Sequence, residues 1–217
     1  FHHSIYTPRP IEDVVEETRS IKARTVFIVD DNITADFERA KELFKALIPL
    51  KIRWISQGSL DMAADPELLR LMRRSGCLGV LIGFESLNPK TLRGMNKTWN
   101  AQYDYVEAVD AIHRAGIAIY ATFMFGYDED HAGCFQKTLD FAVERKFFLA
   151  AFNHVVPFPG TKLYDDFAAE KRLLYDKWWL EPEMRFGDVT FKPAQMTPQE
   201  LSDGCFQARK AFFAPRS

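Results

Sequence analysis

The chain has 217 residues with 28 basic and 30 acidic side chains, and 47% of its residues are hydrophobic, which is typical of one globular domain with a sizeable core. The net charge of -2 argues against a dominant nucleic-acid surface. The longest apolar stretches, 117–125 and 147–152, are far shorter than the ~20 residues of a membrane-spanning helix. The scattered cysteines Cys77, Cys134 and Cys205 favour a reducing, cytoplasmic setting over disulfide bonding.

Amphipathic segments alternate with short apolar runs in chain order. The amphipathic segments predict a helix over 10–21, further helices around 37–47, 68–72, 106–112 and 135–143, and another from 161. The runs rich in Val, Ile and Phe predict strands at 25–29, 52–56, 79–84, 117–125 and 149–156. Strands that are apolar at almost every position are typical of a parallel sheet covered by helices, so the predicted class is α/β.

The helix at 10–21 precedes every predicted strand. Because parallel sheets are built from strand–helix–strand units, we expect one more strand upstream of Phe1, which makes six. The opening Phe1 in place of a methionine also leads us to expect that the chain is part of a longer protein. Such a sheet would expose an edge, and we expect association through that edge.

The end of the chain has a different character. Residues 175–193 are aromatic and rich in turn formers. A capping box from Thr197 to Glu200 then predicts a last helix. We therefore expect a barrel-like domain over 1–174 and a C-terminal extension over 175–217, whose aromatic part either covers the open edge or contacts a substrate.

The ends of the first two predicted strands carry polar groups, and functional residues of parallel α/β folds lie at the carboxyl ends of strands. Asp30, Asp31 and Asn32 can bind hydroxyls, ammonium groups or a hard cation. The alternative is that they only shape the turn. Gln57 and Ser59 follow the second strand and suit a neutral part of a ligand.

The third and fourth strands also end in candidate residues. Glu85, followed by Ser86, can bind a pair of ribose hydroxyls or take part in proton transfer, although a structural carboxylate is the alternative. Gly126, between Phe125 and Tyr127, allows close approach of a ligand to the backbone, or is an ordinary loop glycine.

No metal site is predicted from the residues themselves. The adjacent His2 and His3 lack a third ligand nearby. His154 lies inside the fifth strand and is expected to be a core or wall residue. Phe158, between two prolines after that strand, is a further candidate for a binding surface.

Taken together, four segments resemble the radical SAM enzymes, and in particular the class that carries an N-terminal cobalamin-binding domain. The segments are Val-Asp-Asp-Asn at 29–32, Gly-Phe-Glu-Ser at 83–86, Phe-Gly-Tyr at 125–127 and Pro-Phe-Pro-Gly-Thr-Lys-Leu-Tyr at 157–164. The resemblance implies a partial (β/α)6 TIM-like barrel. It also implies a [4Fe-4S] cluster on a C-x3-C-x2-C loop, where S-adenosylmethionine (SAM) is cleaved to a 5′-deoxyadenosyl radical.

The resemblance also implies roles for the candidate residues. Asp30, Asp31 and Asn32 would lie near the methionine ammonium of SAM, and Glu85 with Ser86 near its ribose hydroxyls. The remaining implied contacts are a cavity lining of Gln57 and Ser59, an adenine contact from the backbone of Phe125, Gly126 and Tyr127, and an apolar wall at Phe158. The implied partners are a small-molecule substrate and an upstream cobalamin-binding domain.

One element of the family pattern is missing, because no C-x3-C-x2-C occurs in this sequence. Cys77, Cys134 and Cys205 are too dispersed to replace it, since cluster ligands must converge. We therefore expect that these residues alone do not assemble the cluster or generate the radical. The alternative is a complete non-redox α/β module that binds a nucleotide-like small molecule.

Overall fold

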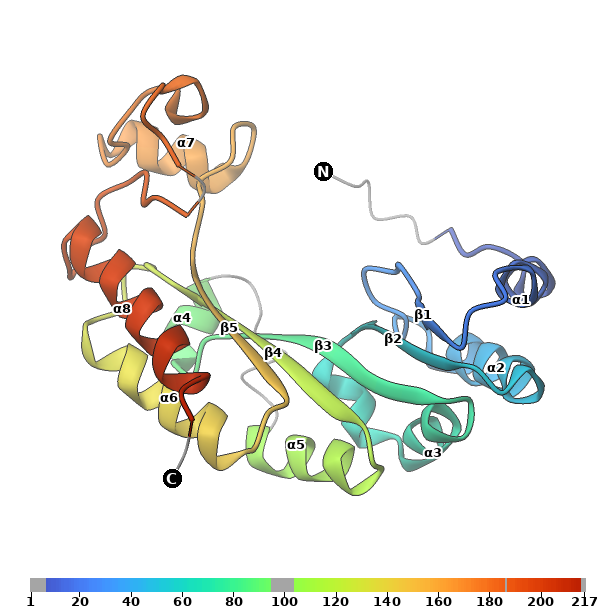
Figure 1. Cartoon of the computed structure of the whole chain (residues 1–217). Coiled ribbons are helices and arrows are strands. Elements are labelled where there is room, and N and C mark those ends of the chain that lie inside the picture. The colour runs from blue at the N-terminus through green and yellow to red at the C-terminus, as the bar shows by residue number, and fades with distance from the viewer. Residues whose placement is uncertain (1–6, 95–103, 186, 216–217) are drawn as a thin grey trace. The chain divides into compact units, whose positions relative to one another are not determined.

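The computed structural model describes residues 7–94, 104–185 and 187–215. All five predicted strands are confirmed, and they form one sheet in the order β1-β2-β3-β4-β5 (Figure 1). The pairs β1–β2, β2–β3 and β4–β5 are parallel. The strands are β1 (Thr25–Phe27), β2 (Arg53–Gly58), β3 (Cys77–Glu85), β4 (Ala118–Phe125) and β5 (Leu149–His154). The α/β class and the partial TIM-like barrel architecture are thus confirmed.

The predicted helices are also confirmed, most within a few residues of the expected ends. They are α1 (Ile11–Ser20), α2 (Phe37–Leu47), α3 (Pro66–Arg74), α5 (Tyr105–Arg114), α6 (Gly133–Glu144), α7 (Lys162–Ala169) and α8 (Pro198–Phe212). The short α4 (Pro89–Gly94) and the 3-10 helices at Ile48–Leu50, Leu60–Ala64 and Trp178–Leu180 were not predicted. Among the described residues, no helix is both long and apolar enough to cross a membrane.

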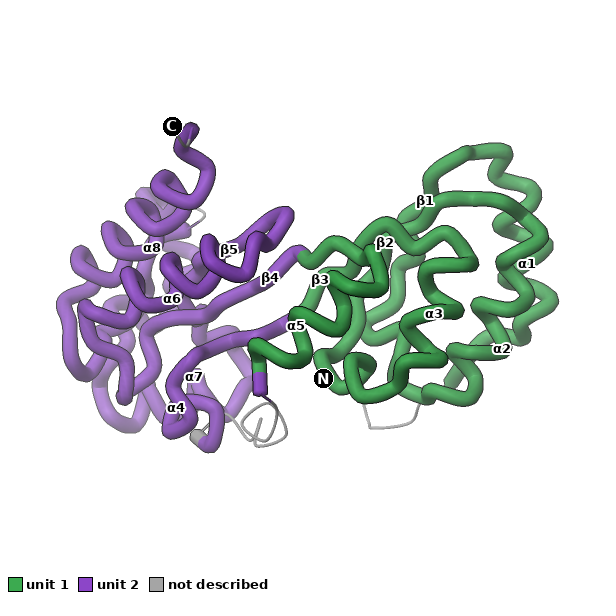
Figure 2. The backbone as a smooth tube through the Cα atoms, turned by 90° about the horizontal axis from the view of Figure 1, so that it is seen from below, with its two compact units in different colours: residues 1–82, 105–119 green, residues 83–104, 120–217 purple. Residues whose placement is uncertain are grey.

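The chain forms two compact units (Figure 2). The first comprises residues 1–82 and 105–119, and the second comprises residues 83–104 and 120–217. The expected extension over 175–217 belongs to the second unit together with β5. A separate domain beginning at residue 175 therefore stays a prediction.

In the first unit, local sequence determines where α3 begins and ends. The Asp65 carboxylate accepts a hydrogen bond of 2.9 Å from the Leu68 backbone N–H, and Pro66 occupies the first turn. Gly76 follows the helix with φ +102°, and a Cβ there would lie 2.0 Å from the Ile52 carbonyl oxygen. Only glycine fits this turn into β3.

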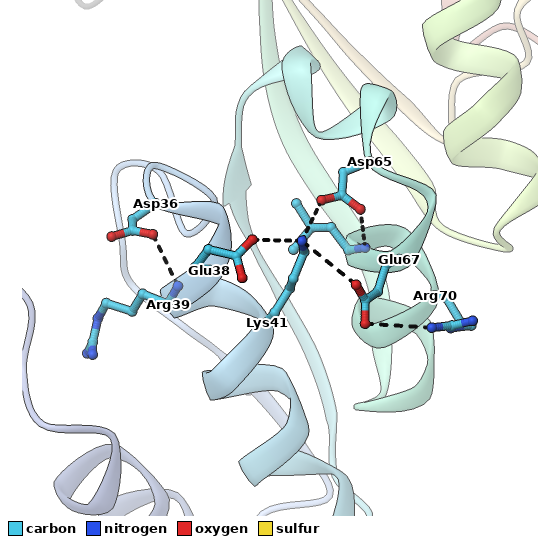
Figure 3. A network of polar contacts seen from close by, with 8 residues as sticks. Asp36, Glu38, Arg39, Lys41, Asp65, Glu67 and Arg70 are labelled. Atoms are coloured by element: carbon cyan, nitrogen blue, oxygen red, sulfur yellow. Dashed lines mark hydrogen bonds and ion pairs between the residues drawn. The ribbon is translucent and has the colours of Figure 1, made fainter.

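An ion-pair network joins α2 to α3 in the same unit (Figure 3). Lys41 Nζ lies 2.8 Å from Asp65 Oδ2 and 2.9 Å from Glu38 Oε1. Glu67 lies 3.9 Å from Lys41 and 3.7 Å from Arg70. The hydrogen bonds of Asp65 and Glu38 raise the pKa of Lys41, and Lys41 in turn lowers the pKa of Asp65.

The core of the first unit lies between helices and sheet, where Phe44 stacks on Trp54 with ring centroids 5.1 Å apart. Trp54 is fully buried and its Nε1–H donates to Ser75 Oγ at 3.1 Å. Helix α1 contributes little to this core, because Thr18 is the only buried residue of that helix. Ile21, the C-cap residue of α1, is 52% exposed.

The core of the second unit is a cluster of phenylalanines from β3, β4, β5 and the helices. Phe84 lies 5.1 Å from Phe147, Phe123 lies 5.8 Å from Phe152, and Phe152 lies 6.0 Å from Phe212. These tilted and stacked rings are favourable arrangements for aromatic pairs. Phe212 belongs to α8, so the last helix is part of this core.

Helix α8 also protects the edge of the sheet, since β5 is the last strand of the order. Arg209 Nη2 donates to the Phe152 carbonyl oxygen at 3.0 Å and to Asn153 Oδ1 at 3.2 Å. A Cβ at Gly204 would lie 2.3 Å from the Phe135 ring, so glycine allows α8 to pack closely on α6. One backbone acceptor of this edge strand is thereby hydrogen-bonded by α8.

Candidate functional site

Successive residues of a strand point alternately to the face covered by helices and to the accessible face. Along β3, Val80, Ile82 and Phe84 are buried, whereas Leu81, Gly83 and Glu85 are half-buried. In the first unit, β2 buries Trp54 and Ser56 and leaves Arg53, Ile55 and Gln57 accessible to different degrees. The predicted residues Gln57 and Glu85 thus lie on the accessible face.

The first unit brings the predicted residues at the ends of β1 and β2 together. Asn32 Nδ2 donates to Ser59 Oγ at 3.1 Å, which links the two loops. Ser59 Oγ donates in turn to the Asp61 carboxylate. Asp30 Oδ1 accepts a hydrogen bond of 3.2 Å from the Asn32 backbone N–H. Asp31 is exposed.

Thr34 organises this group, and sequence reasoning missed it. Its side chain is 1% exposed, and its hydroxyl donates to Asn32 Oδ1 at 2.9 Å. The Thr34 backbone N–H donates to the same oxygen at 3.1 Å. A Cβ at Gly58 would make an ordinary van der Waals contact with the Thr34 hydroxyl, at 3.5 Å. The Asn32 amide is therefore fixed in orientation, while the Gln57 side chain has no hydrogen-bond partner among the described residues.

In the second unit, Glu85 ends β3 in an unusual backbone conformation. Its φ is +64°, and the Ser86 backbone N–H donates to the Phe84 carbonyl oxygen at 2.8 Å. This is a γ-turn with a non-glycine residue at its centre, which is rare and strained. Such strain often occurs at functional sites, where the rest of the structure holds it in place.

Ser86 continues this turn into α4. Its side chain is 8% exposed, and its Oγ accepts a hydrogen bond of 3.0 Å from the Asn88 backbone N–H. Asn88 Oδ1 then accepts one of 2.9 Å from the Lys90 backbone N–H at the start of α4. Ser86 therefore has a clear role in building the turn, which a sequence pattern does not separate from ligand binding.

The end of β4 is built around Asp130, a second residue that sequence reasoning missed. Asp130 Oδ2 accepts hydrogen bonds from the backbone N–H groups of Gly126 at 3.0 Å and Tyr127 at 3.1 Å. Its Oδ1 accepts one of 3.3 Å from the Thr91 hydroxyl of α4. Asp130 is 2% exposed, and burial raises its pKa. The carboxylate therefore fixes the turn that follows Phe125.

Gly126 is required at this turn for two reasons. Its φ is +103°, and a Cβ would lie 2.8 Å from Leu201 Cδ2 and 2.9 Å from Phe191 Cζ. The extension and α8 thus pack directly against the end of β4. Burial, together with the nearby carboxylates of Glu85 and Asp130, raises the pKa of the Tyr127 phenol to about 12. The phenol therefore stays protonated at neutral pH.

The end of β5 is tied to the extension. His154 is buried, as expected, and its ring nitrogens lie 3.0 Å from the Val155 carbonyl oxygen and 2.9 Å from that of Gly187. Phe158 lies beyond the strand and is 56% exposed. The contact with Gly187 links residues 33 positions apart, which no local sequence pattern predicts.

The thiols of this chain do not fit a metal cluster. Cys77 is the first residue of β3, whereas Cys134 lies on α6 and Cys205 on α8. Burial raises the pKa of each thiol to about 12. Within the described ranges, no group of three His, Cys, Asp or Glu residues could hold a metal ion.

Comparison with known proteins places this arrangement in a family. The model of the radical SAM superfamily matches residues 2–142. The chain therefore belongs to the radical SAM superfamily.

Several of the similar curated proteins are methyltransferases, and another is an anaerobic magnesium-protoporphyrin IX monomethyl ester cyclase. Bacteriochlorophyllide d C-12(1)-methyltransferase of Chlorobaculum tepidum is 35% identical over 164 residues, covering 73% of this chain and 36% of that protein. Hopanoid C-2 methylase of Rhodopseudomonas palustris is 27% identical over 158 residues, covering 70% of this chain and 30% of that protein. The chain thus spans about a third of the length of these two relatives.

A solved structure shares the fold. TsrM of Kitasatospora setae, a radical S-adenosylmethionine methyltransferase with cobalamin and a [4Fe-4S] cluster bound, matches with a TM-score of 0.65 and 18% identity. The match covers 90% of this chain and 41% of that chain. At this identity the likeness concerns the architecture, which agrees with the partial barrel described above.

Proposed function

We propose that this chain is the SAM-binding part of a radical SAM methyltransferase that methylates a carbon atom of a large ring-containing substrate. The observation that carries the proposal is the placement of polar groups at the carboxyl ends of β1 to β4. The two curated relatives support the substrate class, because their names specify a bacteriochlorophyllide and a hopanoid. Both are large ring systems.

The proposed roles follow the two units. In the first unit, Asp30 and Asp31 are proposed to bind the methionine ammonium of SAM, because carboxylates favour a cation. Asn32 and Ser59 form the fixed polar wall beside them, which Gln57 extends.

In the second unit, Glu85 is proposed to accept hydrogen bonds from the ribose hydroxyls, with Ser86 holding its turn. The backbone from Phe125 to Tyr127 is proposed to contact adenine, because Asp130 fixes the orientation of its peptide groups. Phe158 is proposed as an apolar wall. In each of the polar roles, a hydrogen-bond donor of one partner faces an acceptor of the other.

The cofactors of the whole enzyme are proposed to be SAM, a [4Fe-4S] cluster and cobalamin bound to a further domain. When bound, the cluster supplies the electron that cleaves SAM. The cysteines of this chain do not fit as its ligands, so we propose that these 217 residues alone are inactive. Their free thiols also favour a reducing compartment such as the cytoplasm.

Calorimetry with SAM tests the binding role of Glu85. We expect Glu85→Ala to weaken SAM binding by about 10- to 100-fold, because a hydrogen bond to a charged group is worth ~1.5–3 kcal/mol. Glu144→Ala, at the exposed end of α6, is the matched control and is expected to bind SAM as the unmodified chain does. Equal affinity of all three proteins would remove Glu85 from the site.

Iron and sulfide analysis after anaerobic reconstitution tests the second part of the proposal. We expect substoichiometric iron, because no three thiols converge. About four irons per chain would contradict the proposal, since that is the content of one [4Fe-4S] cluster. SAM binding without a cluster is also what the alternative, a non-redox nucleotide-binding module, predicts, and methyl transfer by the full-length enzyme separates the two.

A further inference from the structure

A partly exposed cluster of aromatic rings lies beyond β5 in the second unit. Phe158, Tyr164, Trp178 and Trp179 form a continuous series of ring contacts, which we call the aromatic surface. The ring centroids are 5.9 Å apart for Phe158 and Trp178, 5.7 Å for Trp178 and Trp179, and 6.0 Å for Trp179 and Tyr164. Phe158 is 56% and Trp179 42% exposed.

The aromatic surface is not a cover for the core, because other residues of the extension have that role. Val189, Thr190 and Phe191 are buried, and Phe191 stacks on Phe167 of α7 with centroids 4.8 Å apart. The extension therefore has a buried part and an exposed aromatic part. The exposed aromatic part has another role, since contiguous exposed apolar side chains usually mark a binding surface.

Two of the four rings, those of Trp178 and Tyr164, are half-buried and held in place by hydrogen bonds. Trp178 Nε1–H donates to the Pro157 carbonyl oxygen at 3.0 Å, and the Tyr164 hydroxyl donates to the Asp176 carbonyl oxygen at 2.6 Å. Both polar groups are thus satisfied within the protein. What these two residues leave for a ligand is the apolar faces and edges of their rings.

The position of the surface connects it to the proposed site. Phe158 follows β5 at its carboxyl end, the end at which β3 and β4 of the same unit present Glu85 and Gly126. Figure 1 shows α7 directly beyond this end of β5. The Thr161 hydroxyl donates to the Phe158 carbonyl oxygen at 2.6 Å and caps α7, so the Phe158 backbone is fixed relative to that helix.

We propose that the aromatic surface binds the planar ring system of the substrate, a conjugated macrocycle several rings wide. The proposal rests on the proposed function for the identity of the substrate class. The present proposal adds the aromatic residues that would bind this substrate. Phe158 and Trp179, the two exposed rings of the surface, both contact Trp178.

The test measures binding of zinc protoporphyrin IX, a planar fluorescent tetrapyrrole, to the 217-residue chain without SAM or iron. We expect saturable binding that Phe158→Ala and Trp179→Ala each weaken about tenfold or more, as loss of ~1.4 kcal/mol or more of ring contact would do. Phe206→Ala is the matched control, because Phe206 on α8 is also 56% exposed and lies outside the surface. We expect it to leave the affinity unchanged.

Three results would overturn the proposal. The first is no binding by the unmodified chain, and the second is equal weakening by all three substitutions, which would indicate non-specific adsorption. The third is a dimer in sedimentation that dissociates in Phe158→Ala while porphyrin binding is unaffected, which would assign the surface to a second copy of the chain. Because the assay contains no SAM, its failure leaves the Glu85 calorimetry as an independent test of the proposed function.

Discussion

The carboxylate of Asp130 holds the backbone N–H of Gly126 at 3.0 Å, and through it the turn that ends β4. We expect Asp130→Ala to lower the free energy of unfolding by about 2–4 kcal/mol, because the buried N–H of Gly126 and the part-buried N–H of Tyr127 lose their acceptor. Asp130→Asn retains an acceptor oxygen and is the control, expected to retain most of the stability. Chemical denaturation measures both, and equal stability of Asp130→Ala and the unmodified chain would contradict this role.

Because the pKa of Asp130 is raised, we also expect the free energy of unfolding to depend on pH. A group whose pKa is higher in the folded state favours folding below its unfolded pKa, and this contribution is lost as the pH rises through the folded pKa. The unmodified chain should therefore gain stability relative to Asp130→Asn as the pH falls from 7 towards 4. A difference independent of pH would show that the carboxyl titrates alike in both states.

Gly126 should be intolerant of substitution through two effects that can be separated. Gly126→Ala places a Cβ 2.8 Å from Leu201 in a backbone with φ +103°, and we expect a loss of about 2–5 kcal/mol from backbone strain and overpacking. Gly160→Ala has φ +78° with open space around it. It should lose only the strain part, about 1–2 kcal/mol. If both variants lost the same amount, packing of the extension would not depend on Gly126.

The ion pair of Lys41 and Asp65 should make the stability of the folded chain depend on pH. The pKa of Asp65 is lowered in the folded state, so its contribution is present above the unfolded pKa and is lost as the pH falls through the folded pKa. Asp65→Asn retains the cap of α3 and removes the charge. We expect its melting temperature to be lower than that of the unmodified chain at pH 7, with the gap closing below pH ~4.

The cysteines should react slowly in the folded protein. Burial raises the pKa of Cys77 and Cys205 to about 12, so at pH 8 almost no thiolate is present to attack an alkylating reagent. Iodoacetamide labelling followed by mass spectrometry should modify these two residues only after denaturation. Rapid labelling of Cys77 in the native protein would contradict its burial at the start of β3.

The sequence predicted those features that depend on local chemistry. The strand positions followed from runs of apolar residues, and the capping box of Thr197 and Glu200 was visible as a spacing and is present. The contact of Asn32 with Ser59 could also be anticipated, because parallel strands end at the same edge of a sheet.

The features that sequence reasoning missed depend on partners far along the chain. Thr34 and Asp130 look like ordinary turn residues until their burial and their hydrogen bonds are known. The positive φ of Glu85 is not encoded by a glycine, and so the sequence carries no sign of it. The exposure of α1 follows from what packs against the helix, and periodicity does not report that.

The contact of Arg209 with the Phe152 carbonyl oxygen has a consequence for how the protein associates. A guanidinium on this carbonyl and a helix packed against the strand hinder the addition of another strand beside β5. Polymerisation by continuous sheet growth needs two receptive edges on each molecule, and here one is occupied. If chains do pair through β1, the assembly should therefore stop at two, and light scattering should detect dimers without longer oligomers.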